Sequence, residues 1–563
     1  MNAVYVLILG LIVVLLGYRV YAKYVDEKVI QADSKRMTPA KMYMDGVEFM
    51  PTSKKILYGY QFKSIAGAGP IVGPIIAIQW GWLPALVWIL LGAFFIGWVQ
   101  DYASGMISVR NDGASFGGLS HRLISPRARI ILLAFMYFYL LLCASAFGAI
   151  VAGACIKLKA APMAWLFLTG AGLLAGQMIY RWKQDIILTT AVTVLISLVG
   201  IWVGSKVPSD SILGVGLSNS TWLWAILAFV FCYFSAVLPI WRFALPINYV
   251  AAYIVFLGLF FGCIGILVLR PEFTLPAYQS FEIGIGPLWP IMFVTIACGA
   301  VSGWHSIVSS SGTARQLESE LDARPVGAGM MFLEMILALF ALIIAGTIYS
   351  TMAEYTEALT GTPAAVFAAG VTKFLAVLGL PANVGHSYGS VMIIFLAITL
   401  MQLQIRFMRV ATSELLGDVS PIFKNAHVGT IIACILAVIL VFTGWWQYLW
   451  IVFGGANQLM ASLALLLITA WLVSEGRPSS WAFYPMIFMF VTTVAALLYT
   501  SYNLLVNKVL AGAVKGTDLI GDTLVGIVAL FLVVAALVIA WEGYKAFRRF
   551  REVKAAALAL SKA

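Results

Sequence analysis

Apolar residues form long, nearly unbroken runs along this 563-residue chain, and short polar joints separate them. A helix of roughly 20 apolar residues spans the ~30 Å hydrocarbon core of a bilayer, and counting such runs predicts about fifteen transmembrane helices. The runs begin near Asn2, Ile56, Trp82, Ile130, Pro162, Ile186, Thr221, Pro246, Leu288, Gly327, Ser387, Val428, Gln447, Trp481 and Leu519. The pattern therefore predicts an all-α polytopic membrane protein.

Composition agrees with this prediction, because 62% of residues are hydrophobic and only 10% are charged. Soluble chains carry about 25% charged residues, so the soluble and disordered classes are excluded. A net charge of +11 would suggest nucleic acid in a soluble protein, but here Lys and Arg gather in alternate joints. Cytoplasmic loops collect such charges. We therefore expect an outside N-terminus, a cytoplasmic C-terminus and no nucleic-acid partner.

The six cysteines all lie inside apolar runs, without a CxxC pair and without His or Cys at zinc-ligand spacing. This pattern favours neither disulfides nor a metal site. We expect no cofactor.

The segment Ile65 to Pro74 reads IAGAGPIVGP and places three glycines and two prolines inside one membrane-length run. Proline costs about 3 kcal/mol in a helix interior and glycine about 1 kcal/mol. Backbone freed at membrane depth is tolerated only where it lines a cavity or is buried in protein. The segment predicts a broken helix whose carbonyls hold a cation and whose amides suit a carboxylate. A proline-kinked helix crossing is the alternative.

Polar residues precede this break, and Lys63 is the most informative of them. An ammonium at membrane depth costs a few kcal/mol, so Lys63 should face a partner or a wet cavity. The residues predicted to bind substrate are Gln61, Lys63, Gly67, Ala68, Gly69, Pro70, Gly73, Ser235 and Pro239.

Two later runs also contain breaking residues. SAVLPIW places Ser235 and Pro239 inside the run from Thr221, and ACGAVSGWHSIVSSSG interrupts the run from Leu288. The second stretch combines small residues, hydroxyls and a histidine that is a possible proton carrier. The predicted ion-coupling residues are Ala66, Ser302, His305, Ser306 and Ser309. The Thr221 run lies five spans after the Ile56 run, which is the spacing that two inverted five-helix repeats require.

Three further polar positions have simpler interpretations. Asp101 is interpreted as an interfacial cap or an ion-pair member, with a functional role as the alternative. Glu334 is expected to pair with a nearby arginine, or else to act as a proton site. The stretch FGGANQL, Phe453 to Leu459, is interpreted as packing, with a third kinked element as the alternative.

Seven stretches resemble the carbon starvation protein A family of membrane transporters. They are DGVEFMPTSKKILYGYQF, IAGAGPIVGP, LPALVWILLGAFFIGWVQDY, VRNDGASF, FVTIACGAVSGWHSIVSSSGTARQL, DARPVGAG and FGGANQL. The resemblance implies ion-coupled uptake of pyruvate or short peptides, with H⁺ or Na⁺, through the prokaryotic plasma (inner) membrane during carbon limitation. It also implies a core similar to amino acid, polyamine and cation transporters, with two inverted five-helix repeats, broken helices and extra helices. On that analogy the Leu288 run faces the first break.

This chain departs from the family pattern at two places. Many relatives have a His-His pair where this chain has Tyr60 and Gln61, and many have Pro-Arg-Asp-Tyr where it has Pro246, Ile247, Asn248 and Tyr249. We expect Lys63 to take over the lost charged role.

The expected organisation is a first helix and cytoplasmic loop (1–50), a transporter core (51–415), and C-terminal helices with a basic tail (416–563). A channel would need filter loops or charged rings, and a membrane enzyme would need a recognisable nucleophile signature. The sequence shows neither, so a carrier is favoured over a channel and over an enzyme.

Overall fold

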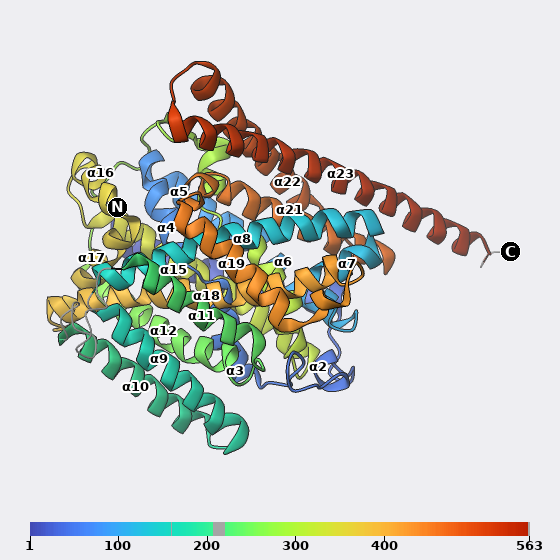
Figure 1. Ribbon diagram of the computed structural model, residues 1–563, viewed down its shortest axis with the longest axis horizontal. Helices are drawn as coiled ribbons and strands as arrows, with labels where there is room; N and C mark the ends of the chain where they lie inside the picture. The colour runs from blue at the N-terminus through green and yellow to red at the C-terminus, as the bar shows by residue number, and fades with distance from the viewer. Residues whose placement is uncertain (159, 207–219, 561–563) are drawn as a thin grey trace.

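Helices make up almost all of the computed structural model, which describes residues 1–158, 160–206 and 220–560 (Figure 1). Twelve of these helices are long and apolar enough to cross a membrane. Two helix pairs bent at a short break also pass this test, and one shorter apolar helix, Thr221–Val237, accompanies them. Each predicted run coincides with helical structure. The all-α, multi-span fold class is confirmed.

The first third of the chain forms the helices that surround the first predicted break. They are α1 (Ala3–Leu15), η1 (Leu16–Ala22), η2 (Val25–Ile30), α2 (Pro39–Met42), α3 (Lys54–Ile65), α4 (Gly69–Ala77), η3 (Ile78–Trp80), α5 (Trp82–Gly92), η4 (Ala93–Gly97), α6 (Trp98–Val109), α7 (Phe116–Leu123) and α8 (Pro126–Lys157).

The middle of the chain contains a peripheral helix pair, a short hairpin and the second interrupted span. Its elements are α9 (Ala160–Gly176), η5 (Gln177–Arg181), α10 (Ile186–Lys206), α11 (Thr221–Val237), α12 (Ala244–Leu269), β1 (Glu282–Ile283), β2 (Gly286–Pro287), η6 (Leu288–Met292), α13 (Phe293–Thr295), α14 (Gly303–Ser311), η7 (Thr313–Arg315), η8 (Glu320–Asp322), η9 (Arg324–Ala328) and α15 (Gly329–Thr347). The two strands pair antiparallel.

The last third begins with the pair α16 (Met352–Gly361) and α17 (Pro363–Ala376), which turns by 114° and forms no straight span. The remaining elements are α18 (Ala382–Leu416), η10 (Pro421–Lys424), α19 (Ala426–Thr443), α20 (Trp446–Trp450), α21 (Phe453–Ser474), α22 (Ser480–Tyr502), η11 (Asn503–Leu510) and α23 (Gly516–Leu560). Helix α18 runs through the centre with its membrane window fully buried, whereas α10 and α19 lie at the periphery.

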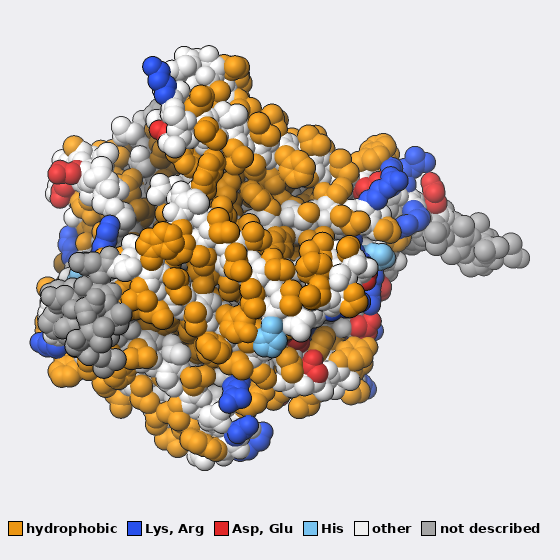
Figure 2. Space-filling model, in the orientation of Figure 1, with side chains coloured by type: hydrophobic (Ala, Val, Ile, Leu, Met, Phe, Trp, Pro, Cys, Tyr) orange, Lys and Arg blue, Asp and Glu red, His pale blue; other side chains and the backbone are white. Residues whose placement is uncertain are grey.

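The outer surface is largely apolar, as Figure 2 shows for one face. Large hydrophobic side chains such as Ile187 on α10 (74% exposed) and Phe531 on α23 (65% exposed) point outward. Exposed apolar area on this scale would be unfavourable in water, whereas lipid accommodates it. The surface therefore agrees with a protein embedded in a bilayer.

The two interrupted spans, α3–α4 and the Leu288–Ser311 run, lie side by side in opposite directions. The neighbouring pairs, in order along the first span, are Gln61 with Ser309, Ser64 with Trp304, Gly69 with Cys298 and Gly73 with Thr295. Residue numbers rise along one span as they fall along the other, so the spans are antiparallel. This is the arrangement that inverted repeats give to their broken helices.

The break predicted at Ser235 and Pro239 is wrong. Helix α11 simply ends at Val237, the chain turns, and α12 begins at Ala244. A proline just after a helix end terminates the helix. Helix α11 packs against α8, α18 and α19. The partner of the first break is therefore the Leu288 run and not the Thr221 run.

The loop between α2 and α3 is fastened to this helix end by a partly buried ion pair. Glu48 accepts from Arg406 Nη2 at 2.8 Å and from Arg409, while Arg406 Nη1 donates to the carbonyls of Ser235 (2.7 Å) and Leu238 (3.1 Å). Burial raises the pKa of Glu48, but the two guanidiniums outweigh it and hold that pKa at about 2, against 4.5 for a free side chain.

We predict that Glu48→Gln destabilises the protein by about 3 kcal/mol at neutral pH, since each pKa unit corresponds to about 1.4 kcal/mol. The folded-state pKa is lowered, so this stabilisation is complete above pH 4.5 and is lost as the pH falls toward 2. Thermal unfolding of the detergent-purified protein across this pH range measures it. Glu357→Gln, on exposed α16, is the control. A difference in stability between wild type and Glu48→Gln that does not change with pH would contradict the lowered pKa of Glu48.

Candidate functional site

The first predicted break is present, and it separates α3 from α4 with a 46° bend. Helix α3 ends at Ile65, Ala66 is extended (φ −73°, ψ 93°), and the helix resumes at Gly69. The Ala66 carbonyl accepts from Lys63 Nζ at 3.4 Å. The break therefore directs a backbone oxygen toward a buried ammonium.

Glycines let the two interrupted spans touch at this break. A Cβ at Gly69 would lie 2.6 Å from Cys298 Sγ, and one at Gly73 would lie 2.6 Å from the Thr295 carbonyl oxygen. A Cβ at Gly67 would lie 2.4 Å from Leu400 Cδ1 on α18. The alternative interpretation, a helix crossing that needs small residues, therefore also applies here, because these glycines allow the close packing of the two spans.

A cavity of about 410 Å³ ends on the two breaks. Its inner wall includes Gly69, Gly73 and Cys298, and its outer part includes exposed Gly284 and partly exposed Lys508. Its other lining comes from α4, η6, α13, α20, α21, α22 and η11. Of the residues predicted to bind substrate, Gly69 and Gly73 line this cavity, whereas Gln61, Lys63, Ser235 and Pro239 do not.

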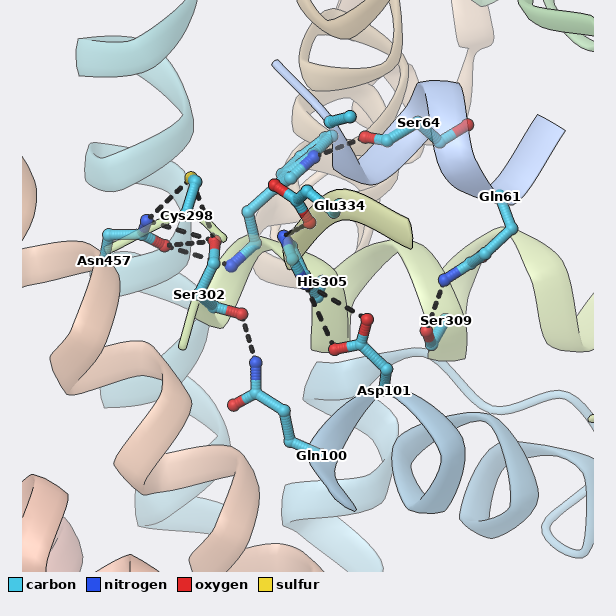
Figure 3. Close-up of polar contacts among 12 residues, drawn as sticks. Gln61, Ser64, Gln100, Asp101, Cys298, Ser302, His305, Ser309, Glu334 and Asn457 are labelled. Carbon is cyan, nitrogen blue, oxygen red and sulfur yellow. Dashed lines mark hydrogen bonds and ion pairs between the residues drawn. The ribbon is translucent and has the colours of Figure 1, made fainter. Parts of the chain in front are cut away.

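A buried cluster centred on His305 lies behind the breaks (Figure 3). His305 Nδ1 lies 3.2 and 3.1 Å from the two Asp101 carboxylate oxygens. His305 Nε2 lies 3.1 Å from Glu334 Oε2, outside the angles of a hydrogen bond. All three side chains are 0% exposed. Two carboxylates therefore flank one imidazole in a site closed to solvent.

This cluster corrects two interpretations made from the sequence. Of the two interpretations of Asp101, the ion-pair member is confirmed and the interfacial cap is wrong, because Asp101 is buried beside His305. Among the described residues, Glu334 pairs with His305 and not with an arginine. Lys63 is also fully buried, and its Nζ binds the Ala66 carbonyl at the break. No carboxylate among the described residues lies within ion-pair distance of Lys63, so its partner at this depth is a backbone oxygen.

Gln61 and Ser309 bind each other. Gln61 Nε2 donates to Ser309 Oγ at 3.1 Å, and Gln61 Oε1 accepts from Thr313. These bonds join α3 to α14 and η7 on one side of the cluster. Gln61 is thus placed to hold the two spans together.

The second break spans Ile296 to Ser302, and two adjacent amides of α21 bind its backbone. Gln458 Nε2 donates to the carbonyls of Phe293 (2.8 Å) and Ile296 (3.3 Å). Asn457 Oδ1 accepts from Trp304 N (3.1 Å), Ser302 Oγ (3.2 Å) and Tyr139 OH (3.0 Å). The packing interpretation of FGGANQL missed this role. The signal in the sequence that could have revealed this role was the pair of adjacent amide side chains, Asn457 and Gln458, inside a predicted span.

The remaining predicted ion-coupling residues lie along this second span. Ser302 belongs to the Asn457 network, and its carbonyl accepts from Gln100. The buried Ser306 hydroxyl has no hydrogen-bond partner within the described chain. Ala66 lies across from them at the first break.

Comparison with known proteins identifies the family. The profile described as "Carbon starvation protein CstA" matches residues 2–357 and 347–496. The chain belongs to the CstA carbon starvation family.

The CstA relatives include two named peptide transporters. One, from Escherichia coli K12, is 30% identical over 88% of this chain and 80% of its own length. The other, from Bacillus subtilis 168, is 27% identical over 96% of this chain and 97% of its own length. The pyruvate/proton symporter BtsT of Escherichia coli K12 is 34% identical over 62% of this chain and 49% of its own length. These names agree with the expectation of a carrier and not an enzyme.

Similar solved structures include a manganese transporter from Eremococcus coleocola and MhsT in complex with L-phenylalanine. The first covers 90% of this chain and 99% of its own, with a TM-score of 0.48 and 12% identity. The second covers 88% and 99%, with a TM-score of 0.44 and 11% identity.

The departures from the CstA pattern have visible consequences. Asn248 accepts from Gln402 Nε2 at 2.6 Å and donates to Ser64 Oγ at 3.0 Å. An uncharged amide chain therefore joins α18 to α3 just before the break. The Tyr60 hydroxyl is buried there without a partner in the described structure.

We predict that Asn457→Leu destabilises the protein by about 3 kcal/mol or more. Three buried donors lose their acceptor, and each unsatisfied group costs about 1–3 kcal/mol. The thermal unfolding midpoint in detergent measures this effect. Asn507→Leu, at an exposed position of η11, is the matched control and should change little. Equal midpoints for the two variants would show that Asn457 does not support the break.

Proposed function

We propose that this CstA-family protein is a proton-coupled secondary transporter that takes up pyruvate or short peptides. The observation that carries the proposal is the meeting of two antiparallel interrupted spans at a buried charged cluster beside a cavity. Interrupted helices at membrane depth form the substrate and ion sites of secondary transporters. The names of the peptide transporter and pyruvate/proton symporter relatives support the substrate class and the proton.

The substrate carboxylate binds at the first break, from Gly67 to Gly73. The N-terminal amides of α4 carry positive dipole, and the Lys63 ammonium lies one turn before the break. The contact of Gly69 and Gly73 with the cavity supports this position. Gln61, Ala68 and Pro70 belong to the same segment. Ser235 and Pro239 are left out, because they lie beside Arg406 at the end of α11.

The coupling proton is held by His305 between Asp101 and Glu334. The geometry supports this, since the imidazole lies 3.1 Å from a carboxylate oxygen on each side. Ala66, Ser302, Ser306 and Ser309 surround the route between the two breaks. Sodium is the alternative coupling ion.

The transporter lies in the plasma (inner) membrane with an outside N-terminus and a cytoplasmic C-terminus. The Lys and Arg distribution supports this orientation. The cavity then opens outward, and the Glu48 loop lies on the cytoplasmic side. Residues 51–415 form the core, to which Asn457 and Gln458 of the C-terminal segment contribute the bonds that support the second break.

Uptake by reconstituted protein tests the function. We expect proteoliposomes to accumulate labelled pyruvate or a labelled dipeptide under an inward proton gradient, and not under a sodium gradient. Accumulation driven only by a sodium gradient would identify sodium, in place of the proton, as the coupling ion. Absence of both accumulation and counterflow would overturn the proposal, and a large uncoupled current would indicate a channel.

We predict that Gly69→Leu abolishes uptake while insertion and yield stay normal. The larger side chain would enter the Cys298 contact and the inner wall of the cavity. Gly153→Leu on α8 is the control, since a Cβ there meets nothing within 4 Å. Normal uptake by Gly69→Leu would refute the placement of the substrate.

We predict that Lys63→Met lowers uptake by about tenfold or more, because a hydrogen bond to a charged group contributes about 1.5–3 kcal/mol. Initial rates at saturating and limiting substrate, measured across pH, quantify the loss. Lys373→Met on exposed α17 is the control. Unchanged kinetics would remove Lys63 from the mechanism.

A further inference from the structure

Cys298, His305 and Glu334 bring three metal-ligating side chains into one buried cluster (Figure 3). The Cys298 thiol comes from the second break, the imidazole from α14 and the carboxylate from α15. One ligand atom of each lies within 4.8 Å of the other two. Small adjustments of side-chain rotamers would bring all three onto a single ion.

The ligand atoms are oriented for an ion. Asp101 holds the proton on His305 Nδ1, so loss of the proton between Nε2 and Glu334 leaves the Nε2 lone pair free to bind an ion. His305 Nε2 and both Glu334 oxygens are buried without hydrogen-bond partners in the described chain. A buried unpaired polar atom is costly, and a cation would satisfy all three. A carboxylate behind a ligating histidine is the usual supporting arrangement in metal sites.

The charge of the cluster and its access from the cavity also suit a bound cation. A Cys298 thiolate and the Glu334 carboxylate balance the two charges of a divalent cation, so the ion and its three protein ligands together are neutral. A neutral cluster is far less costly to bury than a charged one. Cys298 also lines the 410 Å³ cavity. An ion therefore has a path to the thiol without crossing the packed core.

We propose that Cys298, His305 and Glu334 bind one divalent transition metal ion of the zinc class, with Asp101 as a positioning residue. A thiolate, an imidazole and a carboxylate together suit borderline cations such as Zn²⁺ and Co²⁺, and not Mg²⁺ or Ca²⁺. The thiol proton and the proton between His305 Nε2 and Glu334 leave on binding. Sequence spacing missed this site because Glu334 comes from another helix.

Cobalt spectroscopy tests the site without any transport assay. Co²⁺ titrated into the full-length protein in detergent should produce a thiolate-to-cobalt charge-transfer band that saturates at one ion per chain and is displaced by Zn²⁺. Cys298→Ser should abolish the band, and Glu334→Gln should weaken binding. Asp101→Asn should keep the band but weaken affinity about 10- to 100-fold.

The matched control is Cys263→Ser, on α12 outside the cluster, which should leave the band intact. Thermal unfolding of each metal-free variant separates lost binding from lost folding. A wild-type protein without the band, or a band that survives Cys298→Ser, overturns the proposal.

One consequence rests on the proposed function. A metal on His305 Nε2 occupies a nitrogen assigned to the coupling proton, so Zn²⁺ should inhibit proton-driven uptake in wild type and much less in Cys298→Ser. If uptake itself fails, the proposed function fails while the cobalt result still decides the metal site.

Discussion

Backbone polar groups at membrane depth have no water to bind, so each interrupted helix needs partners within the protein. The two interrupted spans meet this need largely through each other and through α21. Trp304 Nε1, on the second span, donates to the Ser64 carbonyl at the end of α3 at 2.6 Å. Gln458 and Trp88 donate to the carbonyls of Phe293 and Ile296 on the other side. The first break thus depends on a donor from the second span, and the second break depends on donors from α5 and α21.

Charged side chains at membrane depth also need partners within the protein. Four ionisable side chains, Lys63, Asp101, His305 and Glu334, lie fully buried in one region. Two are carboxylates and two are bases, so the cluster is neutral when as many bases are protonated as carboxylates are ionised. Gain or loss of one proton from that state leaves a net buried charge, which is costly. A proton that enters or leaves the cluster therefore changes the stability of the packing around it.

The sequence predicts the first break well because the cause is local. Three glycines and two prolines within ten residues disfavour a helix in any environment. The break predicted at Ser235 and Pro239 is wrong because a proline just after a helix end looks the same, in sequence, as a proline within a helix. The sequence could not name the partner of Asp101 or of Glu334 for a different reason. Their partner His305 is distant in the chain, and only the packing of α6 and α15 around α14 brings them together.

The packing around the site differs between its two ends. On the cavity side, the breaks are reached through space lined by exposed Gly284. On the other side, Gln61 bonds to Ser309, and the Glu48 loop, which directly precedes α3, is fixed by Arg406 of α18. A route to that side requires both sets of bonds to open, and separating Glu48 from the buried Arg406 would leave a guanidinium without its carboxylate. Closure of this side therefore depends on an ion pair that lies outside the site.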